Sequence, residues 1–129
     1  MKKLLLSIFV LSGTLLAVDW VKDIDTALMQ ANKEHKNVMV MVEGEYCRWC
    51  KKMKGRTLTD DAVEKRLKNY VVVKVMRGDG NAMGKLPPVQ GVPTIFFMKP
   101  DKTIIQEVMG YFNVEDFISY INDVEKKPN

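Results

Sequence analysis

The stretch that decides the fold is residues 38–50, which read Val-Met-Val-Met-Val-Glu-Gly-Glu-Tyr-Cys-Arg-Trp-Cys. Residues 38–42 form an unbroken apolar run, which is typical of a strand buried on both faces of a sheet that is covered by helices. Gly44 ends this run, and a helix is predicted from Cys47 to about residue 56. When a Cys-x-x-Cys pair opens a helix directly after a buried strand, the spacing indicates redox chemistry.

The two cysteines are expected to have different roles in thiol-disulfide exchange. Free N–H groups and the helix dipole at a helix N-terminus favour the thiolate, so Cys47 is predicted to have a pKa well below the free value of about 8.5 and to act as the nucleophile. Cys50 lies one turn deeper on the same face, where its thiol can resolve a mixed disulfide. Arg48 adds a positive charge that favours the thiolate, and Tyr46 and Trp49 offer an apolar rim for a peptide chain.

Other roles for the cysteine pair have less support from the sequence. A structural disulfide between residues three apart closes almost no loop and contributes little stability. A c-type haem site is excluded because Lys51 stands where the attachment motif needs histidine. Two thiolates can bind copper(I), so a metal-carrier module stays open, although Met39, Met41, Met76 and Met98 fall inside predicted strands, where methionine fills space. We expect no resident metal and no cofactor.

The apolar periodicity outside this stretch predicts an alternation of helices and strands. The predicted elements are an amphipathic helix over 19–36, a helix from about 59 to 69, strands over 70–76, 94–98 and 103–109, and a last helix from Asn113 to Val124. Residues 78–90 are predicted to be a loop with at most a short helical turn over 82–85. This order predicts an α/β domain in three layers, a mixed sheet of about four strands with helices on both faces.

Length and charge exclude several classes of protein. The 129 residues, 47% hydrophobic and 28% charged, suit one domain with an ordinary core. The 20 Lys and Arg against 16 Asp and Glu give a net charge of +4, and removal of Lys2 and Lys3 with a leader peptide leaves +2. Because this balance is nearly even, we expect no binding to nucleic acid.

Residues 1–17 are predicted to be a cleavable signal peptide, because a short basic start is followed by an apolar run that ends at Ala17. A helix that crosses a membrane needs about 20 mostly apolar residues, and this run is shorter and includes polar positions, so no permanent membrane anchor is expected. Export leaves residues 18–129 as a periplasmic domain. In that compartment an unprotected cysteine pair becomes oxidised unless a dedicated pathway reduces it.

A proline stands just before the third predicted strand, in the run Gly91-Val92-Pro93-Thr94. Proline cannot donate a ladder hydrogen bond, so Pro93 must lie at a strand start or edge, and its peptide bond can be cis. The motif alone leaves an ordinary loop proline as an equal alternative.

Taken together, these residues resemble thioredoxin-fold proteins, and within them the exported thioredoxin-like group that includes the C-terminal domain of the transmembrane disulfide reductase. The resemblance covers nearly all of residues 19–125 and rests on Tyr46 to Met53, Thr57-Leu58 with Asp60 and Val63, Val92-Pro93-Thr94, and Gly110. It implies that Pro93 is cis and faces the cysteine pair. It also implies that the backbone of Val92 pairs with a bound substrate strand.

One departure from thioredoxin concerns the proton acceptor of the resolving cysteine. Met41 stands where thioredoxin has a buried acid, and strand alternation places Glu43 on the same face and nearer the cysteine pair. Glu43 is therefore proposed to accept that proton. The alternative, which the residues alone favour, is a solvated carboxylate at the strand end.

The expected function is reduction of disulfides in exported protein substrates, with electrons supplied by a membrane disulfide reductase. This direction rests on the resemblance, and a disulfide oxidant or isomerase, a copper(I) module and a peptide-binding domain are the alternatives. Cys47 and Cys50 are the predicted catalytic residues, and the predicted substrate-binding residues are Tyr46, Arg48, Trp49, Val92 and Pro93. Lys51, Lys52 and Lys54 are predicted to form a solvated helix face, which could also steer an acidic partner.

Overall fold

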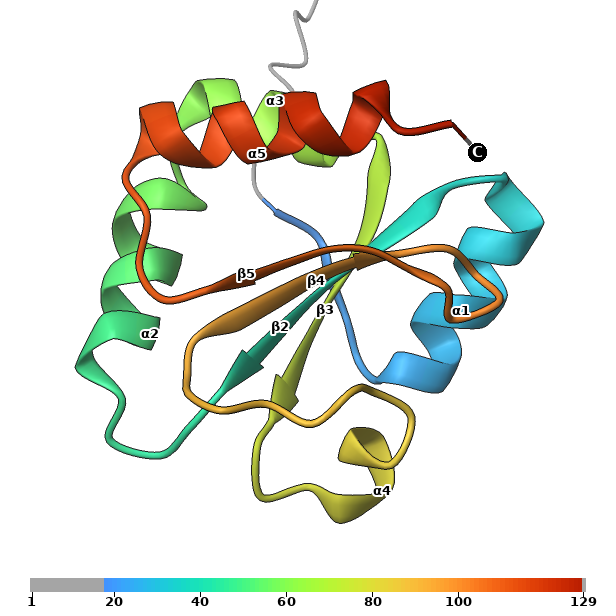
Figure 1. The fold of residues 1–129 in the computed structure, drawn as a ribbon, viewed down its shortest axis with the longest axis horizontal. Coiled ribbons are helices and arrows are strands. Elements are labelled where there is room, and N and C mark those ends of the chain that lie inside the picture. The colour runs from blue at the N-terminus through green and yellow to red at the C-terminus, as the bar shows by residue number, and fades with distance from the viewer. Residues whose placement is uncertain (1–17, 129) are drawn as a thin grey trace, which may run out of the picture.

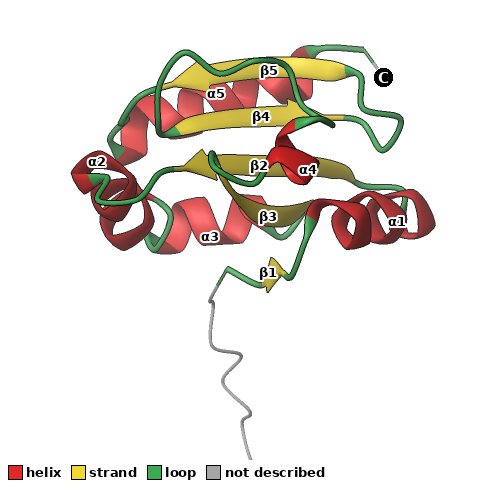
Figure 2. Ribbon diagram, turned by 90° about the horizontal axis from the view of Figure 1, so that it is seen from below, coloured by secondary structure: helices red, strands yellow, loops and turns green. Residues whose placement is uncertain are grey.

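The computed structural model describes residues 18–128, and the predicted signal peptide over residues 1–17 lies outside this range. A five-stranded mixed sheet has the strand order β1-β3-β2-β4-β5, which Figure 2 shows side by side. The strands are β1 (Trp20–Val21), β2 (Asn37–Glu43), β3 (Tyr70–Met76), β4 (Thr94–Met98) and β5 (Ile104–Met109). Strands β1 and β2 run parallel to β3, whereas β4 runs antiparallel to β2 and to β5.

Helices cover both faces of this sheet. They are α1 (Ile24–Glu34), α2 (Arg48–Lys52), which continues into the π-helical segment η1 (Met53–Thr57), α3 (Asp61–Leu67), α4 (Gly80–Met83) and α5 (Val114–Lys126). Figure 1 shows α2, α3 and α5 on one side of the sheet and α1 and α4 on the other. Helices α1, α3, α4 and α5 each begin at an Asp or Asn side chain that accepts a hydrogen bond from the first turn, namely Asp23, Asp60, Asp79 and Asn113.

The alternation of side chains along β2 divides the core into two clusters. Met39 and Met41 face the cluster with Cys50, Leu58 and Phe117, which lies against α2, α3 and α5. Val38, Val40 and Val42 face the cluster that α1 covers with Ile24, Ala27 and Ala31. All five of these β2 side chains are fully buried, as the apolar run predicts for a strand covered on both faces.

Most predicted elements are present, and the N-terminal one needs correction. The strands over 70–76 and 94–98 match β3 and β4, and the three-layer α/β class is confirmed. The helix predicted from residue 19 begins only at Ile24, because Asp23 caps it and Trp20–Val21 pair with β3 as a short fifth strand. The short helical turn in the loop, α4, begins two residues earlier than predicted.

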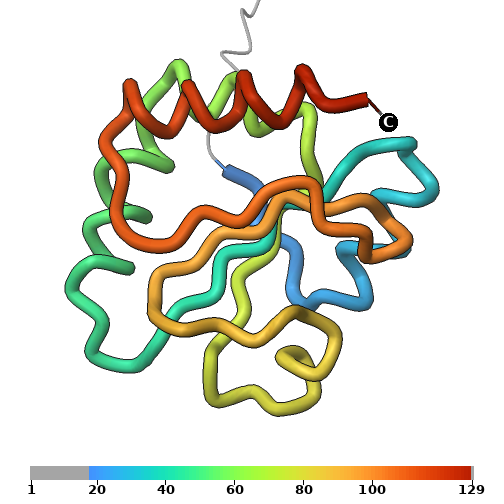
Figure 3. The backbone as a smooth tube through the Cα atoms, in the orientation of Figure 1, coloured from blue at the N-terminus to red at the C-terminus, as the bar shows by residue number. Residues whose placement is uncertain are grey.

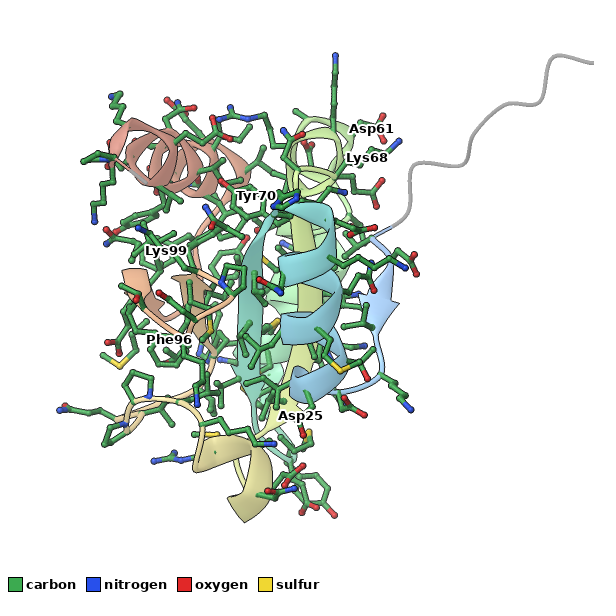
Figure 4. All side chains as sticks on the ribbon, turned by 90° about the vertical axis from the view of Figure 1, so that its right-hand side faces the viewer. Asp25, Asp61, Lys68, Tyr70, Phe96 and Lys99 are labelled. Atoms are coloured by element: carbon green, nitrogen blue, oxygen red, sulfur yellow. A yellow bond between two sulfur atoms is a disulfide. The ribbon has the colours of Figure 1, made fainter. Side chains whose placement is uncertain are left out.

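The segment between α4 and β4 passes the end of the sheet where β2 ends, just before the cysteine pair in the chain. Lys85 forms an ion pair at 2.6 Å with Asp25, which Figure 4 labels in the first turn of α1, and this pair ties the segment to the helix. Figure 3 shows the chain then passing the ends of β2 and β3 before it enters β4. This path brings residues 91–93 beside the loop that follows β2, where a Cβ on Gly44 would lie 3.1 Å from the Val92 side chain.

Candidate active site

Cys47 and Cys50 form a disulfide at the start of α2, directly after the loop that follows β2. The two cysteines differ in exposure, because Cys47 is partly buried while Cys50 is only 2% exposed and packs in the core with Met41 and Met53. The backbone N–H of Cys50 donates a hydrogen bond to the sulfur of Cys47 at 3.1 Å. An incoming thiolate can therefore approach Cys47 far more readily than Cys50.

The two aromatic residues beside the disulfide differ in exposure and in contacts. Tyr46 is 98% exposed, whereas Trp49 is 45% exposed and lies against Tyr111, with 5.7 Å between ring centroids. The Nζ atom of Lys52 lies 4.9 Å from the Trp49 ring centroid and 4.5 Å from the Tyr111 ring centroid. The guanidinium of Arg48 covers the Trp49 ring at 5.3 Å. Both cations lie within the range of cation–π attraction.

A shallow groove of about 330 Å³ opens beside the disulfide, lined by Trp49, Val92, Pro93, Gly110 and Tyr111. The peptide bond between Val92 and Pro93 is cis, and the buried Pro93 forms the floor before β4 begins. Its carbonyl accepts a hydrogen bond from the backbone N–H of Gly110 at 2.8 Å. The fold thus brings Trp49, Val92 and Pro93 together, three of the five predicted substrate-binding residues.

The loop that carries Tyr111 is held at both ends. Gly110, whose φ of +105° favours glycine, is fixed to Pro93 by the hydrogen bond just described. At the other end, the hydroxyl of Thr57 donates to the carbonyl of Phe112 at 2.6 Å, and Thr57 is fully buried. The loop therefore joins the proline segment to the helical stretch that follows the cysteines.

Sequence reasoning did not identify Tyr111, Lys52 or Thr57 as residues that shape this groove. Tyr111 is 61 positions after Cys50 in the chain, and Thr57 meets Phe112 across 55 residues. Two positions of the family pattern were signals in the sequence, namely Thr57 itself and Gly110, which immediately precedes Tyr111. The fold alone brings these residues beside the cysteine pair.

Glu43 is not the solvated carboxylate that the residues alone favoured. Its side chain is 14% exposed, and Oε1 accepts a hydrogen bond from Nζ of Lys54 at 2.8 Å. The other oxygen, Oε2, is buried without a hydrogen-bond partner among the described residues. Lys54, predicted to be solvated, is only 29% exposed in this pair. Glu43 shares the β2 face of Met41, which packs in the same cluster as Cys50.

The groups with clearly shifted pKa values lie away from the disulfide. Burial, with a smaller contribution from the charge of Glu125, raises the pKa of Tyr70 to about 12. Tyr70 begins β3, at the opposite end of the sheet from the cysteines. Hydrogen bonds from Thr26 lower the pKa of Asp23 at the start of α1.

Within residues 18–128 no three His, Cys, Asp or Glu side chains gather as a metal site would require. The same part of the chain contains no helix of the length and apolarity that crossing a bilayer requires.

The sequence of the chain is similar to those of known proteins. A model of the thioredoxin-like family matches residues 19–100. The thiol:disulfide interchange protein DsbD of Actinobacillus pleuropneumoniae is 32% identical over 95 residues, which are 69% of this chain and 16% of that protein. The chain spans between 16% and 58% of the length of the curated relatives it matches.

Solved structures share the arrangement of the chain. A thioredoxin from Thermus thermophilus superposes with a TM-score of 0.73 at 23% identity, covering 86% of this chain and 89% of that one. The C-terminal domain of DsbD from Neisseria meningitidis gives a TM-score of 0.62 at 22% identity, covering 76% and 90%. At these identities the likeness concerns the fold.

Proposed function

Because the chain belongs to the thioredoxin-like family, we propose that it is a thiol-disulfide oxidoreductase that acts through Cys47 and Cys50. The observation that carries this proposal is the disulfide itself, formed between one accessible and one buried sulfur at the start of a helix. The Cys50 N–H, which points at the Cys47 sulfur at 3.1 Å, would stabilise negative charge on that sulfur in the reduced form.

The proposed reaction transfers two electrons from the cysteine pair to a substrate disulfide. The Cys47 thiolate attacks one substrate sulfur, so that a mixed disulfide forms and the other substrate sulfur leaves as a thiolate. The Cys50 thiol then loses its proton and attacks the Cys47 sulfur, which releases the second substrate thiolate. The protein is left with its own disulfide, and an external dithiol must reduce it before the next turnover. No cofactor takes part in these steps.

The substrate is proposed to bind as an extended segment across the groove. The backbone of Val92 would pair with the substrate strand next to Pro93, and Trp49 would contact its side chains. Tyr46 and Arg48 are proposed to contact the substrate outside the groove, where their exposed side chains flank Cys47.

Glu43 is proposed to accept the proton of the Cys50 thiol. Its support is the buried oxygen Oε2, which lacks a hydrogen-bond partner within residues 18–128, and the Lys54 pair, which holds the carboxylate on the cysteine side of β2. A charged group with a free acceptor lone pair in a dry environment is suited to proton transfer.

The compartment and direction are also part of the proposal. Residues 1–17 would act as a signal peptide that delivers residues 18–129 to the periplasm, without a permanent membrane anchor. There the domain would reduce disulfides of exported proteins, with a membrane disulfide reductase as its electron donor. Reduction is favoured by the resemblance to the reductase domain and by the DsbD relative.

Two measurements test the activity and its direction. The Cys50→Ala variant should accumulate a mixed disulfide with a peptide disulfide, whereas Cys47→Ala should form none; equal trapping by both variants would contradict the assigned roles. The equilibrium potential of the Cys47–Cys50 pair should lie near the thioredoxin value of about −270 mV. A value near about −120 mV would instead identify a disulfide donor.

The role of Glu43 is tested by the pH dependence of the resolution step. Glu43→Gln should slow release of a preformed mixed disulfide and change the pH profile of that step. Glu45→Gln, which removes the same charge from an exposed position two residues later, is the matched control. Identical pH profiles for the two variants would rule out proton transfer by Glu43.

A further inference from the structure

The groove beside the disulfide combines aromatic rings with a nearby positive charge. Thiol exchange alone requires neither. The rings of Trp49 and Tyr111, which lie against each other, line the groove together with Val92, Pro93 and Gly110, and the Lys52 ammonium lies within 5 Å of both ring centroids. We name these three side chains the aromatic clamp. Its rings are apolar, and the Lys52 charge lies close to both of them.

The clamp is fixed in place before any substrate arrives. The Tyr111 loop is tied to Pro93 through Gly110 and to the helical stretch through the fully buried Thr57. A binding surface whose side chains are already ordered loses less entropy on association. The clamp can therefore discriminate between substrate side chains, in contrast to the main-chain pairing at Val92.

The charge around the clamp has one sign. Residues 46–59 contain five basic residues and no acidic one. Lys54 is already paired with Glu43, which leaves Arg48, Lys51, Lys52 and Arg56 without an ion-pair partner among the described residues. Acidic residues flank this stretch on both sides in the sequence, with Glu45 before it and Asp60 after it. An acidic segment bound here would be attracted, and a basic one repelled.

We propose that the aromatic clamp selects protein segments in which an apolar side chain and an acidic residue flank the reacting cysteine. The apolar side chain fills the space lined by Trp49 and Tyr111, and the carboxylate lies beside Lys52 and Arg48. The proposal rests on the proposed function, since it names the class of substrate that the cysteine pair would act on.

Peptides with one cysteine, held as a mixed disulfide with thionitrobenzoate, provide the test. Attack by Cys47 on the peptide sulfur releases thionitrobenzoate, which is followed by its absorbance under single-turnover conditions. Four peptides differ only in the two residues that flank the cysteine. These residues are Leu and Glu, Leu and Gln, Leu and Lys, or Gly and Glu. Rates are measured with the reduced mature protein.

The wild-type protein should show two separate preferences. The Glu peptide should react about threefold faster than the Gln peptide, and the Lys peptide should be slower still. This charge preference should vanish at about 1 M salt, where the Debye length is about 3 Å. Replacing Leu by Gly should slow the reaction about fivefold, and salt should not remove this effect.

Variants assign each preference to its residue. Lys52→Gln should weaken the preference for Glu over Gln and keep the preference for Leu over Gly. Tyr111→Ala should weaken the preference for Leu over Gly and keep the preference for Glu over Gln. Lys65→Gln, the same charge change on the exposed face of α3, should leave all rate ratios as in the wild type. If the alanine variant does not fold, the same rates are measured with Tyr111→Leu.

The results separate the substrate preference from the activity. Exchange with a neutral small disulfide together with equal rates for all four peptides would overturn the substrate preference and leave the oxidoreductase intact. Preferences that persist unchanged in both the Lys52 and Tyr111 variants would also overturn it. Absence of exchange with every disulfide, including the small one, would overturn the proposed function and the substrate preference together.

Discussion

The two faces of the sheet are held to their helices by different kinds of contact. On the α1 face, the buried side chains are mainly valine and alanine with Phe96, and the polar contacts are an N-cap and the Asp25–Lys85 pair. On the α2 face, the cluster with Cys50 is accompanied by hydrogen bonds between distant segments, such as Thr57 to Phe112 and Lys54 to Glu43. The hydrogen bonds of Thr57 and Lys54 are partly buried, whereas the Asp25–Lys85 pair is exposed to solvent.

This difference separates what stabilises the domain from what positions the site. Burial of apolar surface is non-directional, so many arrangements of similar volume serve it equally well. Hydrogen bonds and ring contacts fix particular atoms in place, as at Thr57 and Tyr111. Changes on the α1 face should therefore alter stability without altering selectivity, and changes on the α2 face should alter both.

The largest effect is expected from Phe96→Ala, on the α1 face. Phe96 is fully buried, and truncation of such a ring costs about 3–5 kcal/mol of unfolding free energy. Urea unfolding of the oxidised protein measures this loss. The neighbouring Phe97→Ala, on the other face, should cost a similar amount. If the folded Phe96 variant also lost the preference for Leu-containing peptides, the separation between the faces would be wrong.

The sequence predicted the central strands well because their signal is local. Apolar runs at 38–42, 70–76 and 94–98 are sufficient to mark strands buried on both faces. Trp20–Val21 escaped prediction because two residues carry no period and their pairing with β3 depends on residues more than 50 positions away. Helical spacing after Asp23 was simply extended too far towards the N-terminus.

For the site, the sequence predicted the chemistry but not the shape. Cys47, Cys50 and Pro93 stand in a recognisable local pattern, whereas Tyr111 and Thr57 act through contacts that only the fold creates. The burial of Glu43 was missed for the same reason, since strand alternation gives a side chain's face but not what covers it. Lys54, the side chain that covers it, comes from the helical stretch after the cysteines.

An intermediate effect is expected from Thr57→Val, which keeps the shape of the side chain and removes its hydroxyl. The Phe112 carbonyl then loses its donor, at a cost of about 1–3 kcal/mol, and the Tyr111 loop is freed at one end. Selectivity for Leu over Gly peptides should fall towards that of Tyr111→Ala. Thr57→Ser, which retains the hydroxyl, should keep most of the selectivity. Equal selectivity in the Val variant and the wild type would show that the Gly110 bond alone positions Tyr111.

The smallest effect tests whether polar contacts on the α1 face act on stability alone. Asp23 accepts a hydrogen bond from the N–H of Thr26 at 2.8 Å, and this bond lowers the carboxyl pKa below its ordinary value of 3.8. The charged form is therefore favoured in the folded state, so its stabilising contribution is present above pH 3.8 and is lost as the pH falls through the lowered folded pKa.

Asp23→Asn retains a capping side chain but cannot titrate. Its stability deficit, measured by urea unfolding, should be constant near neutral pH and should shrink as the pH drops below 3.8. Peptide selectivity should not change, because the cap connects only residues three apart at the far side of the sheet from Tyr111; a change in selectivity would mean that α1 is coupled to the site after all.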